Sequence, residues 1–272
     1  MKKEQILYED NDIIVCYKPA GIATQTARVG QRDMVSEVAN YLSGNGSPYV
    51  GCIHRLDQPV EGILVFARNR KAAAELGRQI TENRMEKYYY AVVSESGTDT
   101  AEETGWNRRP ESERKPDTDP GQGKALTDYL LKDAKTNMSR IVSPKAEGAK
   151  KAVLEYEILE RKRFLFKNVP EARSGEGDQA YAALVRVRLI TGRHHQIRVQ
   201  MSHAGMCLLG DYKYADERTK KLSAALDQKQ VALCAYRLDL IHPATGKRMS
   251  FRKEPQGLIF QNFSKQISDK IS

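Results

Sequence analysis

The strongest constraint on the fold is an abrupt change from polar to apolar residues in the first quarter of the chain. A polar run, residues 54–57 (His-Arg-Leu-Asp), is closed by Pro59 and Gly62 and leads into five apolar residues at 63–67. A short apolar run bounded by turn residues is typical of a buried strand, so the polar run before it is predicted to be a loop. Catalytic groups concentrate on loops that a rigid scaffold holds, but the local pattern by itself favours a simple turn.

Length and composition place the chain among ordinary globular proteins. Its 272 residues are 40% hydrophobic and 29% charged, enough to bury a core in one large domain or two small ones. No apolar run approaches the ~20 residues that cross a bilayer, and no signal peptide is visible at the start. We therefore expect a cytoplasmic protein without membrane contact. The net charge of +9 favours a polyanionic partner.

The cysteines give no sign of a metal or redox centre. Four are present, widely separated and without a CxxC pair, so neither a zinc ribbon nor a dithiol motif is supported. They are Cys16, Cys52, Cys207 and Cys234.

Residue patterning predicts strands and helices in a mixed order, which indicates a sheet-rich α+β fold. The expected strands cover 6–17 (two strands joined by an Asp-Asn-Asp turn), 63–67, 87–93, 127–133, 139–143, 152–161, 181–190, and the hairpin 231–241 with 248–252. The expected helices cover 33–42, 70–80 after an Asn69 cap, 194–204 ending at Gly205, and 216–226. Residues 208–214 are expected to form a loop.

Three polar stretches interrupt this pattern, at about 94–124, 144–151 and 167–180. Their composition suits surface insertions better than domain boundaries. We therefore expect one domain over residues 1–272, with no separate domain before Ile6.

The segment 194–204 carries an arginine on a face that should be buried. Helical spacing places Arg198 on the same face as His194, with Ile197 and Met201 beside them. An unpaired charge in a core is costly, so Arg198 needs an anionic partner. The alternative is that its side chain extends to solvent, and the spacing alone does not choose between the two.

Four separated segments, taken together and in order, resemble the RluA-type family of RNA pseudouridine synthases. The resemblance covers nearly the whole chain, and residues 205–214 and 238–252 also look like the family's ending. The four segments are Ile6–Gly21 with its Lys-Pro-Ala-Gly turn, His54-Arg55-Leu56-Asp57, Lys87-x-Tyr89-x-Ala91, and Thr191-Gly192-Arg193-x-His195-Gln196-Ile197-Arg198.

The resemblance implies a fold and an activity. The fold is α+β, with a mixed, largely antiparallel central sheet, flanking helices and a cleft across the sheet. The activity is isomerisation of specific uridines in structured RNA, ribosomal or transfer RNA, to pseudouridine. Asp57 matches the catalytic aspartate, Tyr89 the tyrosine that packs on the target base and has been assigned proton transfer, and Arg198 the arginine that pairs with the aspartate.

The resemblance also implies residues that contact substrate. Arg55 matches the arginine that helps displace the target nucleotide, and Arg193 lies in a motif on the substrate side. His54 and Lys18 occupy motif positions that are structural or RNA-facing. The reaction involves neither redox chemistry nor group transfer, so we expect no cofactor and no metal, with RNA as the partner of a monomer.

The chain departs from the family pattern at three places. Val60-Glu61 replaces the usual Thr-Ser before Gly62, and a glutamate beside an RNA cleft would repel phosphate. Cys207 stands in place of a usual proline, and Cys234 stands where histidine is common. None of these changes removes a residue assigned to chemistry.

Three other functions fit parts of the sequence. A metal-dependent phosphodiesterase could use His54, Asp57, His194, His195 and His203, but adjacent histidines point about 100° apart on a helix and make a poor ligand pair. A catalytically inactive RNA-binding module of the same fold would not need Asp57, Tyr89 and Arg198. A basic scaffold protein would show no preference for RNA over other polyanions.

Overall fold

The computed structural model describes residues 2–26, 30–44, 46–95, 123–165, 179–263 and 267. Its contacts divide the chain into two compact units, each assembled from separated stretches. The first contains Met1–Tyr90, Arg188–Thr191 and Gln230–Ser272, and the second contains Ala91–Val187 and Gly192–Lys229. The expectation of a single domain stays a prediction.

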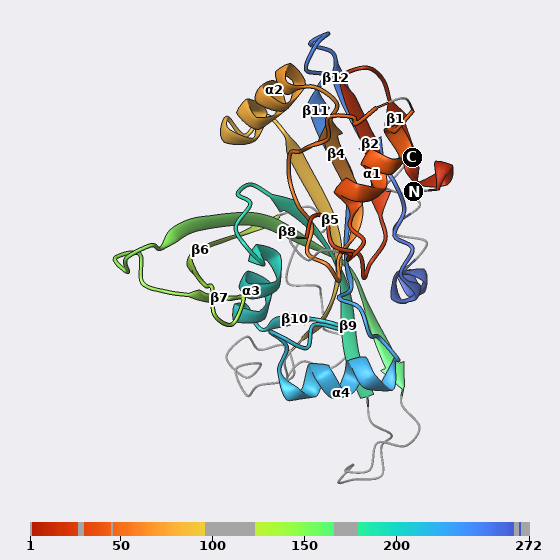
Figure 1. Cartoon of the computed structure of the whole chain (residues 1–272). Coiled ribbons are helices and arrows are strands. Elements are labelled where there is room, and N and C mark those ends of the chain that lie inside the picture. The colour runs from red at the N-terminus through yellow and green to blue at the C-terminus, as the bar shows by residue number, and fades with distance from the viewer. Residues whose placement is uncertain are drawn as a thin grey trace. The chain divides into compact units, whose positions relative to one another are not determined.

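The first unit is a sheet with strand order β1-β2-β4-β11, in which β3 pairs with β4 and β12 with β11 (Figure 1). Among the described strand pairs of this unit, β4 and β11 are parallel and the others are antiparallel. Helix α2 packs on β3, β4 and β11. The bounds are β1 Ile6–Glu9, β2 Ile13–Lys18, α1 Met34–Leu42, β3 Gly51–Cys52, β4 Glu61–Ala67, α2 Arg70–Thr81, β11 Leu233–Ile241 and β12 Arg248–Arg252, with 3-10 helices at Lys3–Gln5 and Leu258–Phe263.

The two helices of this unit begin where capping residues stand in the sequence. Asp33 accepts a hydrogen bond from Ser36 N, and Asn69 accepts one from Ala72 N, each at 2.8 Å. Such side-chain caps satisfy backbone donors that the first turn leaves without partners. The predictions of helices at 33–42 and 70–80 are confirmed.

Strand β4 is the centre of the first unit, and the predicted buried strand at 63–67 is confirmed. Every residue of β2 and β4 is buried. The parallel approach of β11 requires Gly62, whose φ is +134° and whose missing Cβ would lie 2.5 Å from Ala235 N. No L side chain fits that space without backbone movement.

The second unit holds a meander in which β6 pairs antiparallel with both β7 and β8. Helix α3 packs on β6, β7 and β10. Strands β5 and β9 contribute residues to both units. The bounds are β5 Glu86–Glu95, β6 Lys124–Asp133, β7 Met138–Ile141, β8 Lys150–Leu165, β9 Gln179–Leu189, α3 Gln196–His203, β10 Met206–Leu208 and α4 Glu217–Ala225. No helix among the residues described is long and apolar enough to cross a membrane.

Three details differ from the sequence predictions. Helix α3 begins at Gln196 rather than 194, because His195 has a left-handed φ of 54°. Two short strands were not predicted: β3, and β10, whose last residue Leu208 was assigned to a loop. Of the three expected insertions, 144–149 forms a turn between β7 and β8, whereas 96–122 and 166–178 lie outside the described residues.

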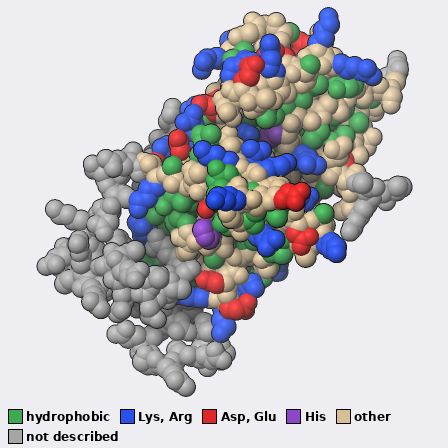
Figure 2. Space-filling view, turned by 90° about the vertical axis from the view of Figure 1, so that its left-hand side faces the viewer, with side chains coloured by type: hydrophobic (Ala, Val, Ile, Leu, Met, Phe, Trp, Pro, Cys, Tyr) green, Lys and Arg blue, Asp and Glu red, His purple; other side chains and the backbone are tan. Residues whose placement is uncertain are grey.

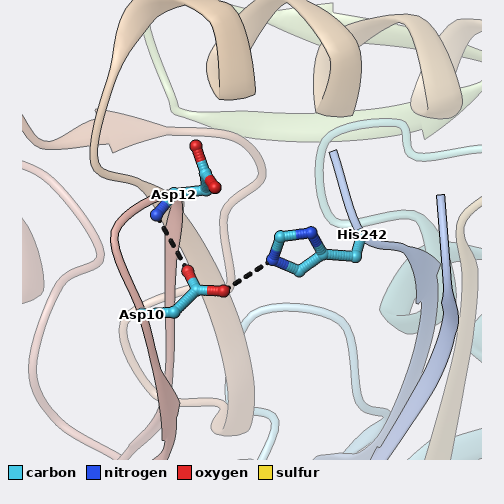
Figure 3. Close-up of side chains that lie close together, drawn as sticks. All are labelled: Asp10, Asp12 and His242. Atoms are coloured by element: carbon cyan, nitrogen blue, oxygen red, sulfur yellow. Dashed lines mark hydrogen bonds and ion pairs between the residues drawn. The ribbon is translucent and has the colours of Figure 1, made fainter. Parts of the chain in front are cut away.

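The turn between β1 and β2 is organised by the carboxylate of Asp10. Its Oδ1 accepts hydrogen bonds from the backbone N–H groups of Asp12 and Ile13, each at 2.8 Å. Its Oδ2 accepts from the Tyr8 hydroxyl at 2.8 Å and from His242 Nε2 at 2.7 Å (Figure 3). The donors of four separate groups therefore converge on one side chain.

Substitution of Gly62 tests the close approach of β4 and β11. We expect Gly62→Ala to lower the free energy of unfolding by ~3 kcal/mol, since the new Cβ meets the backbone of Ala235 at a positive φ. Urea unfolding at neutral pH measures the change. Gly77→Ala is the control, because Gly77 lies in α2 with no atom within 4 Å of an added Cβ. That variant should be unchanged or more stable by up to ~1 kcal/mol.

Substitution of Asp10 tests the turn through its pH dependence. Burial opposes ionisation, but hydrogen bonds from Ile13 and Asp12, then from Tyr8 and His242, lower the pKa of Asp10. The stability it contributes is therefore present above the unfolded pKa, near 4, and is lost as pH falls through the lower folded value. Asp10→Asn should cost ~1–2 kcal/mol at pH 7 and progressively less in acid.

Urea unfolding across the acid range measures this difference between the wild-type protein and Asp10→Asn. The matched control is Asp12→Asn, because the Asp12 carboxylate accepts one side-chain bond, from Asn69 Nδ2 at 2.8 Å. An Asp10→Asn penalty that is equal at pH 7 and in strong acid would contradict the prediction.

Candidate active site

Asp57 lies in the loop between β3 and β4, and the backbone on each side of it is fixed by the segment after β2. Thr24 Oγ1 donates to Leu56 O at 2.8 Å and accepts from Leu56 N at 3.0 Å. After Asp57, Gly21 N donates to Gln58 O at 2.8 Å, and Gln58 Nε2 donates to Gly21 O at 3.0 Å. The loop thus has hydrogen-bonded supports immediately before and after the candidate carboxylate.

Lys18 reinforces the same supports from inside the protein. The residue has no exposed surface, and its Nζ donates to the carbonyl oxygens of Ile22 at 2.7 Å, Pro19 at 3.0 Å and Gln58 at 3.1 Å. Burial lowers the pKa of Lys18 to about 7, against the attraction of Asp57 and Glu61, which raises it. Three carbonyl acceptors match the three donors of an ammonium group, so this cage suits the charged form, which is lost as pH rises past about 7.

The burial of Lys18 changes the role expected for it. A side chain without exposed surface offers RNA nothing to contact, and all three donors of its ammonium have backbone partners. Of the two roles expected for Lys18, structural or RNA-facing substrate contact, its burial favours the structural one, as a support of the Asp57 loop.

Glu61, the residue that departs from the family pattern, does not face an RNA surface. It is 5% exposed. Its Oε2 accepts from the Tyr17 hydroxyl at 2.6 Å and from Gln256 N at 3.2 Å, and its Oε1 accepts from Gly257 N at 3.0 Å. The expectation that Glu61 repels phosphate is wrong, because the carboxylate points into the protein and has three donors.

Strand β5 places Tyr89 within electrostatic reach of Asp57. Tyr89 is 5% exposed, and burial, followed by the charge of Asp57 and then Cys234, raises its pKa. The phenol therefore stays protonated at neutral pH and can donate a proton or a hydrogen bond. An aromatic ring is a surface on which a base can stack, and the role of Tyr89 toward the target base stays a prediction.

Three other basic residues belong to the loop before β4 and to β5: His54, Arg55 and Lys87. Burial, then the charge of Lys87, lowers the pKa of His54 to about 3, and His54 Nε2 accepts from Val65 N at 3.4 Å. His54 is therefore a neutral ring that supports β4. Lys87 is two residues before Tyr89 in β5, and side chains at this spacing lie on the same face of a strand. No role was predicted for Lys87, although this spacing can be read from the sequence. Arg55 is exposed, as an RNA contact requires.

In the second unit, Arg198 has the anionic partner that its position on the helix required. Its Nε donates to Asp211 Oδ2 and its Nη2 to Asp211 Oδ1, both at 2.7 Å. The side chains are 4% and 1% exposed. Asp211 was expected only to lie in a loop, and no role was predicted for it. The pairing of Arg198 with Asp57, which the resemblance implied, joins residues of different units and stays a prediction.

The remaining motif residues of the second unit surround the start of α3. Arg193 is exposed, and its Nε donates to Lys151 O at 2.9 Å. His194 and His195 precede the helix, with rings stacked 3.7 Å apart between centroids, so the helical angle used against them as a ligand pair does not apply. His195 Nδ1 is 2.7 Å from the Tyr214 hydroxyl, and His194 Nδ1 is 2.9 Å from Ser139 Oγ.

The described residues hold one group with the spacing of metal ligands, and it belongs to the β1–β2 turn. It consists of Asp10, Asp12 and His242. The Asp10 oxygens accept four hydrogen bonds, and His242 Nδ1 accepts from the backbone of Ala244 and Thr245. Figure 3 shows the hydrogen bonds that join Asp10 to the His242 ring and to the backbone N–H of Asp12. The hydrogen bonds account for this group, and the five residues of the phosphodiesterase alternative do not form another within the described chain.

The comparisons with known proteins agree on one family. A family model described as RNA pseudouridylate synthase matches residues 12–203. Ribosomal large subunit pseudouridine synthase D of Zymomonas mobilis is 31% identical over 267 residues, covering 93% of this chain and 70% of that protein. The tRNA pseudouridine synthase C of Vibrio parahaemolyticus is 26% identical, covering 90% of this chain and 87% of that protein.

Other relatives are longer than the matched region, and a solved structure shares the fold. Ribosomal large subunit pseudouridine synthase C of Escherichia coli is 30% identical, and the alignment covers 90% of this chain but 64% of that protein. The structure of human RNA pseudouridylate synthase domain containing 4 has a TM-score of 0.64 at 20% identity, covering 97% of this chain and 93% of that chain. The α+β fold with a mixed, largely antiparallel sheet is thereby confirmed, and the chain belongs to the RluA type of the RNA pseudouridylate synthase family.

Proposed function

We propose that this chain, an RNA pseudouridine synthase, isomerises specific uridines of ribosomal or transfer RNA with Asp57 as its catalytic carboxylate. The observation that carries the proposal is the support of the Asp57 loop by Thr24, Gly21 and the buried ammonium of Lys18. A solvated turn needs no such support. A carboxylate that must meet one atom of a substrate does, because small displacements cost large factors in rate.

The reaction breaks the bond between uracil and ribose, turns the base, and rejoins it through carbon. Taking the base out of the RNA stack costs a few kcal/mol, and stacking on Tyr89, worth ~1–3 kcal/mol, offsets part of this cost. Asp57 can attack the anomeric carbon of the sugar, attack the base, or remove a sugar proton. All three roles need its ionised form. The protonated Tyr89 can deliver a proton.

RNA binding is supported by the basic surface. The chain carries a net charge of +9, and Figure 2 shows Lys and Arg side chains across much of the described surface in that view, with Asp and Glu between them. Exposed Arg55 and Arg193 are the candidate contacts from the family motifs. The two RNA classes are proposed because one relative is named for the large ribosomal subunit and another for tRNA.

The test uses RNA that this protein has not already modified. Total ribosomal RNA and total transfer RNA, labelled with tritium at uracil carbon 5, are prepared from cells lacking the gene and incubated separately with purified protein. Pseudouridine formation releases the tritium, and mapping of pseudouridines in the same RNA identifies the position. Release from one pool supports the proposal. Tight RNA binding without release from either pool would instead support an inactive RNA-binding module.

Substitution of Asp57 separates catalysis from binding. We expect Asp57→Asn to reduce tritium release by at least ~10³-fold, because the amide can neither attack carbon nor accept a proton as a carboxylate does. RNA affinity, measured by filter binding, should change little. Asp12→Asn serves as the control for loss of one carboxylate from the same unit, and it should keep full activity. Formation of product by Asp57→Asn at a near wild-type rate would contradict the assignment of Asp57 as the catalytic carboxylate.

The ion pair between Arg198 and Asp211 gives a stability prediction that is independent of activity. Arg198→Ala leaves the carboxylate of Asp211 buried without its bidentate partner, which should cost ~3–5 kcal/mol in free energy of unfolding. Arg198→Met with Asp211→Leu should recover much of that loss, since a well-packed apolar pair avoids the desolvation of both charges. Chemical denaturation of the three proteins measures this, and equal stability of Arg198→Ala and wild type would contradict it.

A further inference from the structure

We propose that Glu61 is a positioning residue for catalysis, whose buried carboxylate ties the segment after β12 to the Asp57 loop and balances the ammonium of Lys18. The inference rests on the proposed function, because it concerns how the Asp57 loop is held in its working state. It assigns a purpose to the position where the chain departs from the Thr-Ser-Gly of its family.

The contacts of Glu61 join three segments that are distant in sequence. Tyr17 lies at the end of β2, Glu61 at the start of β4, and Gln256 and Gly257 after β12. One carboxylate accepts the Tyr17 hydroxyl at 2.6 Å and the two backbone N–H groups at 3.2 and 3.0 Å. Burial, then Cys234 and Glu61, raises the pKa of Tyr17, so its hydroxyl stays protonated and serves as the donor.

The segment after β12 is shaped to receive this carboxylate. A Cβ on residue 257 would lie 3.1 Å from Glu61 Oε1, so glycine allows the backbone N–H to approach. The following 3-10 helix, Leu258–Phe263, anchors the segment through buried Ile259, Phe260 and Phe263. Glu61 therefore links a packed apolar anchor to the strand that begins directly after the Asp57 loop.

Glu61 also lies within electrostatic reach of the Lys18 cage. In the antiparallel register of β2 with β4, Lys18 is opposite Gly62, the residue next to Glu61. The charged groups that act on Lys18 are Asp57 and Glu61, and both favour its ammonium form. With Glu61 present, Lys18 has a counter-charge other than Asp57, so the catalytic carboxylate is not its sole partner.

Replacing Glu61 by glutamine should weaken both its link to the segment after β12 and its role as a counter-charge for Lys18. The amide has one acceptor oxygen for three donors, and its NH₂ group would face a backbone N–H or the Tyr17 hydroxyl. It also carries no charge, so Lys18 loses one of two groups that hold it protonated. As pH rises, the ammonium is then lost sooner, together with the support it gives to Gln58 O.

The experiment compares Glu61→Gln with wild type in the tritium-release assay, as kcat against pH, using the RNA pool that wild type modifies. We expect Glu61→Gln to lower kcat by ~10- to ~100-fold and to move the alkaline limit of activity down by ~1 pH unit or more. Asp10→Asn is the matched control. Asp10 also accepts a tyrosine hydroxyl and two backbone N–H groups, but at the opposite end of β2 from Lys18. It should keep the wild-type kcat and pH profile.

The outcomes separate positioning from simple stabilisation. A Glu61→Gln protein with wild-type kcat and pH profile would overturn the inference. Equal losses in Glu61→Gln and Asp10→Asn, without a shift of the alkaline limit, would also overturn it, because they would reveal a general stability effect. If Glu61→Gln does not fold, Gly257→Ala is used, which keeps the charge but displaces the carboxylate. It should lower kcat several-fold while keeping the wild-type alkaline limit, and an unchanged kcat would count against the inference.

A second readout needs no activity. The pH titration of the Lys18 side chain is followed by NMR in protein with isotope-labelled lysine, with the signal assigned from Lys18→Arg. We expect the Lys18 pKa to fall in Glu61→Gln and to stay constant in Asp10→Asn. If wild type releases no tritium from either RNA pool, the proposed function fails. A Lys18 titration that is the same in Glu61→Gln and wild type overturns the inference on Glu61, whatever the tritium assay shows.

Discussion

The buried ammonium of Lys18 is the interaction on which the candidate site depends. A charge without exposed surface is tolerated only where polar partners replace its water, and here the partners are three carbonyl oxygens of two loops. Two of these carbonyls belong to Pro19 and Ile22, and the third belongs to Gln58, directly after Asp57. The cost of burying the charge therefore favours one arrangement of the two loops, and Asp57, the carboxylate that we propose to be catalytic, lies within it.

The supports of Asp57 come from distant parts of the sequence, and this explains why the local pattern was ambiguous. Thr24 holds the residue before Asp57, Gly21 holds the residue after it, and Glu61 connects the next strand to residues near position 256. A loop held from three directions loses little further freedom when substrate binds. The same residues in an isolated turn would be a solvated bend.

Much of the architecture could be predicted from the sequence, because the relevant signals are local. The apolar run at 63–67, the Asn69 cap and the aromatic and β-branched residues of β5 are each local signals, and the structure confirms those elements. The roles of Glu61 and Asp211 could not be read in this way. A carboxylate in a loop looks the same whether it faces solvent or a buried partner more than ten residues away. Only the fold brings Asp211 to Arg198 and Gly257 to Glu61.

The ion pair of Arg198 and Asp211 shows what such a distant partner adds. A buried pair contributes little net stability compared with apolar packing, so stability alone does not account for it. The geometry of the pair accounts for it better. Two hydrogen bonds of 2.7 Å fix the guanidinium plane of Arg198, and Asp211 is itself oriented by the N–H groups of Lys213 and Tyr214. The left-handed turn at His195 sets where the helix carrying Arg198 begins. Arg198 and the Asp57 loop are therefore each held, within their own unit, by buried polar contacts that restrict their movement before any RNA arrives.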